Sequence, residues 1–157
     1  MGRAKEAQYL PPRHSFNLRG QELVEFAFVF LVLVLFIFGA VDLGRVFYTV
    51  IVVSNAAREG ARYGIVYGTE YDHLTDTLFL TNSGQDIKDA AKQEAAGAQI
   101  SIQNDDIVVV CLPGGGVICQ QGQPLRVTVT HNFTPLLTFI LGQPSLAIRR
   151  AAEMMIP

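Results

Sequence analysis

Charged residues are scarce in this sequence, and this limits what the protein can bind. Only 17 % of the 157 residues are charged, and 12 basic against 14 acidic side chains give a formal net charge of −2. A nucleic-acid-binding protein needs an excess of basic side chains, so nucleic acid is not expected as a partner. Polar side chains are absent altogether from Phe26 to Val41, and half of all residues are hydrophobic. This composition is typical of a membrane protein and not of a soluble enzyme.

The sequence also lacks a recognisable set of catalytic or metal-binding residues. His14, His73 and His131 share no metal-ligand spacing, and no serine elbow, Cys-His arrangement or phosphate-binding loop is present. Asp105 and Asp106 are adjacent, so in an extended chain they would point to opposite faces and could not share a proton. We therefore expect no enzymatic activity, no cofactor and no metal; an anchored envelope enzyme would need a pocket that joins His131 to an acid.

The apolar run from Leu23 to Val41 is interrupted only by Glu25. Its 19 residues would form a helix roughly 28 Å long, about one hydrocarbon core, so the run predicts a single membrane crossing. Residues 1–20 carry a net charge of +3, from Arg3, Lys5, Arg13 and Arg19 against Glu6. Basic residues before a span hold that end in the cytoplasm, so we expect the rest of the chain to be exported across the cytoplasmic (inner) membrane. A cleaved secretory signal is a poorer explanation, since its apolar region is shorter and ends at small residues.

Glu25 is not explained by a simple membrane anchor. An ionised carboxylate inside an apolar run costs on the order of 2 to 3 kcal/mol unless it finds a partner or lies near the interface. Gly20 stands between the basic segment and the apolar run, with Glu25 the fifth residue after it. Glycine passes most easily through a narrow protease cleft, because it has no side chain and wide backbone freedom. Gly20 and Glu25 together suggest a site at which a protease processes the chain.

Several stretches of the sequence together have a recognisable pattern: Arg19–Ala27, the apolar run, Val41–Arg45, Ser54–Tyr63 and, more weakly, Phe133–Leu137. In these stretches the sequence resembles a known family, the TadE-like pseudopilins of the tight-adherence (Tad) pilus machinery. The resemblance implies cleavage by a prepilin peptidase between Gly20 and Gln21, with Glu25 serving processing and docking to a neighbouring subunit's N-terminal amine. It also implies other pilins or pseudopilins, the Tad inner-membrane assembly proteins and the membrane itself as partners, with a possible location in an extracellular pilus. The alternative is a plain signal-anchored ectodomain that binds an extracellular or envelope ligand and never enters a filament.

Helical spacing continues beyond the predicted span. No proline occurs between Pro12 and Pro113, so one helix can run unbroken over residues 21–67. Small residues recur in four-residue steps on two adjacent faces, at Ala57 and Ala61 and at Ala56, Gly60 and Gly64. Such rows allow close helix packing, either against the chain's own domain or between subunits. Arg58 and Arg62 form either a solvated stripe or a contact for a charged partner.

The remaining residues, 68–157, predict a small exported α+β domain, and residues 1–20 a leader that is removed. Residues 68–84 have the composition of a connecting loop, residues 86–98 predict a short helix with Ile87, Ala91 and Ala95 on one side, and strand patterns follow. The strands are expected at 99–102, 107–110, 125–133 and 145–156, in an antiparallel sheet. Cys111 and Cys119 flank a turn of Pro and Gly, and an oxidising compartment would let them pair across the base of a hairpin; two free thiols are the alternative.

Overall fold

The computed structural model describes residues 18–72, 77–116, 118–138, 142 and 145–157. Most of the predicted leader, with Arg3, Lys5, Arg13 and His14, lies outside the described residues, as does His73. The chain forms two compact units, one ending at Ile37 and the other running from Phe38 to the C-terminus. We describe each unit by itself.

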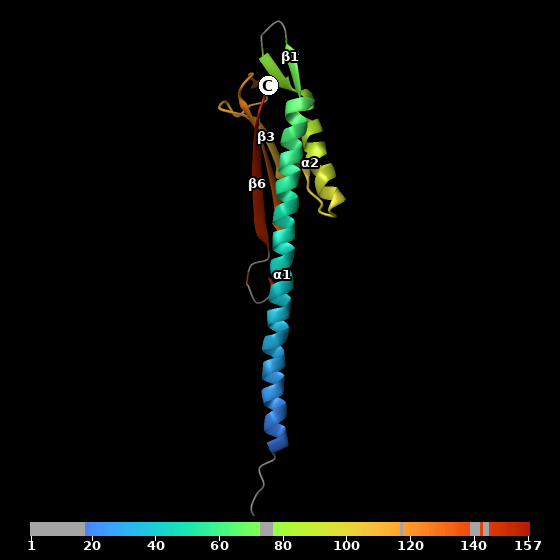
Figure 1. Cartoon of the computed structure of the whole chain (residues 1–157), viewed down its shortest axis with the longest axis vertical. Helices are drawn as coiled ribbons and strands as arrows, with labels where there is room; N and C mark the ends of the chain where they lie inside the picture. Colours follow the sequence, from blue (N-terminus) through green and yellow to red (C-terminus); the bar gives the residue numbers. More distant parts are fainter. Residues whose placement is uncertain (1–17, 73–76, 117, 139–141, 143–144) are drawn as a thin grey trace, which may run out of the picture. The chain divides into compact units, whose positions relative to one another are not determined.

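A single long helix, α1 (Leu18–Val66), contributes to both units (Figure 1). Its bounds are close to the predicted 21–67, as expected for 49 residues without an interior proline. In the first unit the large apolar side chains of α1 are exposed, among them Leu23, Phe28 and Leu33. By length and composition, α1 is the one helix in the described part of the chain that could cross a membrane.

The second unit is an α+β domain, which confirms the predicted fold class. Strands β3 (Ile107–Cys111), β5 (Pro124–Phe133) and β6 (Leu146–Met155) form an antiparallel sheet in the order β3-β5-β6. Inward residues of β5 alternate as predicted, and Leu125, Val127 and Val129 are fully buried. The sheet's centre is β5, because its two long neighbours pair with it on either side.

The second half of α1 packs within this domain through its small residues. Ala56, Ala57 and Ala61 are fully buried, and a Cβ placed on Gly60 would lie 3.2 Å from both Ala91 and Val127. Gly60 therefore lies between the short helix and the central strand. The small-residue rows are expected to pack either against the chain's own domain or against another subunit. In the structure they pack against the short helix and β5 of the chain's own domain.

The short helix α2 (Gln85–Gly97) has the predicted buried face of Ile87, Ala91 and Ala95. Two residues beyond the end of α2, Gln99 has a left-handed backbone conformation (φ 61°), and the N–H of Ile100 donates to the carbonyl of Ala95. This C-cap geometry satisfies the last carbonyls of the helix. The strand predicted at 99–102 is therefore wrong, since the helix cap uses the backbone groups that a strand would need.

A second sheet was not predicted. Strands β1 (Thr69–Asp72), β2 (Thr77–Leu80) and β4 (Ile118–Cys119) pair in the order β1-β2-β4, and a short 3-10 turn, η1 (Thr81–Gly84), follows β2. The loop predicted over 68–84 is therefore wrong. Polar residues dominate the composition of this segment, but Leu78 and Leu80 alternate inward and are buried, which gives β2 one apolar face.

Cys111 and Cys119 form a disulfide, with their Cα atoms 5.3 Å apart. Cys111 ends β3 of one sheet and Cys119 ends β4 of the other, so the bond links the two sheets. The predicted turn of Pro and Gly between the cysteines is present, since Cys111 forms an antiparallel bridge with Gly116. The expected pairing of the two flanking strands with one another is wrong, because β3 pairs with β5 and β4 pairs with β2. Both cysteines are buried, at 1 % and 0 % exposure.

Candidate functional site

The residues predicted for processing lie together in the first turns of α1. Gly20, Gln21 and Glu25 are helical and exposed. A Cβ placed on Gly20 would meet nothing within 4 Å, so packing within the described chain does not require glycine at this position. Within the described residues, Glu25 accepts no hydrogen bond and forms no ion pair.

The surroundings of Glu25 on the helix are apolar. The side chains of Val24, Ala27, Phe28 and Leu31 line a shallow apolar hollow on this part of α1. Phe26 and Phe30 stack on one another, with ring centroids 6.1 Å apart. From Phe26 onward the helix carries no polar side chain before Asp42, so Glu25 is the acid at the edge of the apolar run, which is a costly place for an unpaired charge in a membrane.

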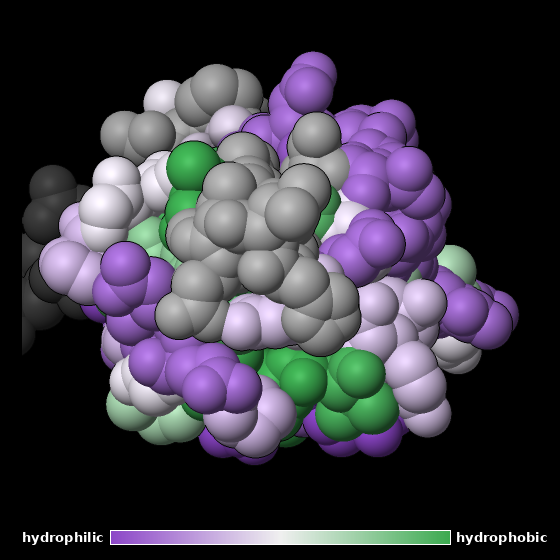
Figure 2. Space-filling model, turned by 90° about the horizontal axis from the view of Figure 1, so that it is seen from above, coloured by the Kyte–Doolittle hydropathy of each residue, from purple (hydrophilic) through white to green (hydrophobic). Residues whose placement is uncertain are grey.

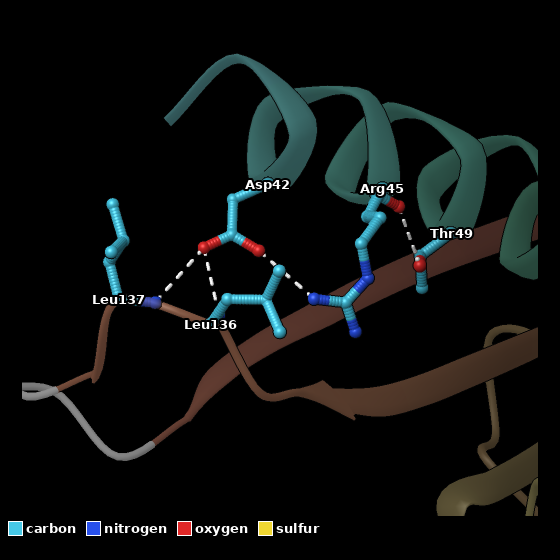
Figure 3. Close-up of polar contacts among 5 residues, drawn as sticks. All are labelled: Asp42, Arg45, Thr49, Leu136 and Leu137. Carbon is cyan, nitrogen blue, oxygen red and sulfur yellow. Dashed lines mark hydrogen bonds and ion pairs between the residues drawn. The ribbon is translucent and has the colours of Figure 1, made fainter. Parts of the chain in front are cut away.

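A second acid, Asp42, has the opposite environment (Figure 3). One carboxylate oxygen accepts hydrogen bonds from the backbone N–H groups of Leu136 (2.8 Å) and Leu137 (3.2 Å). The other accepts from the guanidinium of Arg45, one turn later on α1, at 2.9 Å. Asp42 is almost wholly buried, and three donors compensate for removing its charge from water. It ties α1 to the segment that follows β5.

Arg45 extends this cluster toward the sheet. Its guanidinium lies 4.9 Å from the ring centroid of Phe133, the last residue of β5, and its carbonyl accepts a hydrogen bond from the hydroxyl of Thr49 at 2.9 Å. A cation over an aromatic face gains about 0.5 to 1 kcal/mol at an exposed site. Asp42, Arg45 and Phe133 therefore fix the end of β5 against α1.

Sequence reasoning gave Asp42 no role, although two signals were present. It is the first residue after the apolar run, and Arg45 follows at the spacing that places two side chains on one helical face. The two backbone donors could not be foreseen, because they lie 94 and 95 residues later in the chain.

His131 lines an open groove of about 490 Å³ beside this cluster. The other lining residues include Tyr48, Gln99 and Asn132, and no acid is among the described residues of the groove. The arrangement that an anchored enzyme would need, a pocket joining His131 to a carboxylate, is therefore not formed here. The described residues also contain no group of three His, Cys, Asp or Glu that could hold a metal ion.

A second groove, between α1 and α2, is acidic. Glu59 lines it together with Asp86, Asp89 and Glu94 of α2. Two of these acids are paired, since Arg62 forms an ion pair with Glu59 and the hydrogen bond from Lys92 holds the pKa of Asp89 below its ordinary value. Arg58 is exposed, so Arg58 and Arg62 form a solvent-facing stripe. Asp105 and Asp106 lie in a short 3-10 turn, where Asp106 accepts from the backbone N–H of Gln103.

Comparison with protein families identifies the segment that contains both acids. The family described as TadE-like protein matches residues 20–62. This segment is TadE-like. The match begins at Gly20 and includes Glu25, Asp42 and Arg45, whereas the weaker resemblance at Phe133–Leu137 lies outside it. Curated proteins and solved structures give no match.

The TadE-like match confirms the family resemblance seen in the sequence. It associates the chain with the Tad pilus machinery, and together with the one long apolar helix it indicates a single-pass membrane protein. Within the TadE-like segment the two acids differ in kind. Glu25 is exposed and without a partner in the described chain, while Asp42 is buried and bound by three donors.

Proposed function

We propose that this protein is a pseudopilin (minor pilin) or membrane-bound assembly factor of a Tad-type pilus, processed by a prepilin peptidase. The cut falls between Gly20 and Gln21 on the cytoplasmic face, and the chain beyond the predicted span, which ends at Val41, is exported. The observation that supports this most directly is the TadE-like match, which begins at Gly20, the residue before the proposed cut.

The environments of Gly20 and Glu25 agree with this proposal. Nothing in the described chain crowds Gly20, so its small size is useful to an external enzyme rather than to packing. Glu25 is exposed and unpaired within the described residues of an apolar helix, so it gains from a positive partner. Cleavage after Gly20 would create such a group, the α-amine of Gln21, on this chain and on its neighbours.

The experiment is an intact mass and N-terminal sequence of the membrane-fraction protein, made with and without the host's prepilin peptidase. We expect a start at Gln21 only when the peptidase is present. A start at Met1 in both strains would contradict the proposal and leave the plain signal-anchored ectodomain.

Docking is tested separately with two matched acids on the same helix. Glu25→Gln and Glu22→Gln each remove one exposed carboxylate, three residues apart. We expect only Glu25→Gln to reduce recovery of the protein with other pilus subunits after cross-linking, since Glu25 is the acid that the proposal pairs with a subunit amine. An equal reduction in both variants would contradict that specific role of Glu25.

A further inference from the structure

The end of the α+β domain next to the predicted span carries exposed apolar side chains. We call this set the basal patch, and it consists of Leu43, Phe47, Leu136 and Leu146. Leu43 and Phe47 come from α1. Leu136 lies in the segment that follows β5, and Leu146 is the first residue of β6. All four side chains are about half exposed or more.

The polar contacts of Asp42 fix the level of this patch. Asp42 directly follows Val41, where the predicted span ends, and it binds the N–H of Leu136 at 2.8 Å. Leu146 pairs with Phe133, whose ring lies under the guanidinium of Arg45. Both leucines therefore lie within about one helical turn of the end of the span.

The distances along α1 compare well with the thickness of a bilayer interface. At about 1.5 Å per residue, Leu43 lies roughly 3 Å beyond Val41 and Phe47 roughly 9 Å. The polar headgroup region adds about 5 to 8 Å on each side of the hydrocarbon core. A bilayer around residues 23–41 therefore reaches Leu43, and Phe47 lies at the outer edge of its headgroup region.

The charges above the patch are of the sign that lipid phosphates attract. Arg149 and Arg150 are exposed on β6, three and four residues beyond Leu146, which is roughly 10 to 13 Å along the strand. Arginine can extend along an apolar surface and reach a phosphate with its guanidinium. Figure 2 looks onto the end that carries β1, where hydrophilic residues occupy much of the rim and hydrophobic residues lie between them.

We propose that the basal patch lies in the membrane interface, so that the domain contacts lipid through Leu136 and Leu146 as well as through α1. The occupant is the bilayer, because exposed apolar side chains of α1 follow directly on the end of the predicted span, from Val41 to Leu43 and Phe47. The hydrogen bonds of Asp42 act as the link that holds Leu136 at this level. This contact is independent of leader cleavage and of entry into a filament.

The test uses the full chain reconstituted alone in vesicles of phosphatidylcholine and phosphatidylglycerol. A cysteine is introduced at Leu136 (L136C) and labelled with a small fluorophore, since Cys111 and Cys119 are joined in the disulfide. The matched control is I118C on β4, because Ile118 is 55 % exposed and Leu136 49 %. Ile118 belongs to the sheet that begins with β1, and β1 follows the end of α1 at Val66. Val66 lies roughly 36 Å of helix beyond Asp42, so the control label is far from the end of the predicted span.

We expect lipids with a quencher near the headgroup to lower the emission of the label at Leu136 at least roughly twofold, and to leave the control label unchanged. Iodide, a quencher dissolved in the water, should quench the control label at position 118 more strongly than the label at position 136. Equal quenching at both positions, or strong iodide quenching at Leu136, would overturn the proposal and favour a protein partner for the patch. L146C provides a second label in the patch if L136C does not fold, and it should behave as Leu136 does.

Discussion

The substitution Gly64→Ala tests how α1 packs in the α+β domain. A Cβ on Gly64 would overlap Cδ2 of Leu125 and lie 3.0 Å from Cδ1 of Ile87. Both neighbours are fully buried, so neither side chain can turn toward solvent to make room. Overpacking of this kind costs about 1 to 3 kcal/mol, and contact with two immobile neighbours places the cost near the upper end.

The helix itself partly offsets this cost, because alanine is preferred over glycine in a helix interior by about 1 kcal/mol. The net loss in the free energy of unfolding is then about 2 kcal/mol. With a urea dependence of about 2 kcal/mol per molar, the unfolding midpoint falls by roughly 1 M. Pulse proteolysis of the full chain in mild detergent across a urea series measures this midpoint.

Gly44→Ala is the matched control, since it makes the same change on the same helix where a Cβ meets nothing within 4 Å. Its midpoint should stay the same or rise, because only the helix preference changes. The reasoning about packing is refuted if Gly64→Ala is as stable as Gly44→Ala. That result would mean that α1 does not approach β5 and α2 as closely as the structure shows.

Two further predictions concern the contacts that join distant parts of the domain. Asp42→Ala should lower stability by about 2 kcal/mol, because it removes charged hydrogen bonds, and should speed amide hydrogen exchange at Leu136. The control Glu59→Ala, which breaks an exposed ion pair, should change stability by less than about 1 kcal/mol. Unchanged amide exchange at Leu136 in the Asp42→Ala variant would contradict the role of Asp42. Replacing Cys111 and Cys119 together by serine should cost about 2.5 kcal/mol, and a reducing agent should then lower the urea midpoint of the wild type only. A wild-type midpoint that does not respond to reduction would refute this.

Elements governed by local pattern could be predicted from the sequence. The length of α1 follows from the absence of proline, and the buried face of α2 follows from the spacing of Ile87, Ala91 and Ala95. Strand β3 likewise shows a run of β-branched residues, and β5 shows alternating apolar and polar residues. In the TadE-like segment, the roles of Gly20 and Glu25 stay predictions, which rest on two residues that lie close together and next to an apolar run.

Features that depend on contacts between distant residues could not be predicted. The partner of β4 is β2, and its register is set by only two residue pairs, which leave little trace in the sequence. The donors to Asp42 are backbone groups, and every residue other than proline carries such a donor. The sequence therefore marks an acid at the end of the span but does not reveal what binds it.

The disulfide lies where it can stabilise the smaller of the two sheets in the α+β domain. The sheet that contains β1, β2 and β4 is small, since its strands are two to four residues long, and such a sheet is marginal alone. Its buried contribution to the core comes largely from Leu78 and Leu80. The covalent bond from Cys119 to Cys111 tethers this small sheet to β3 of the other sheet. Loss of the disulfide should therefore loosen this small sheet before the sheet centred on β5, and hydrogen exchange at Leu78 should rise more than at Val127.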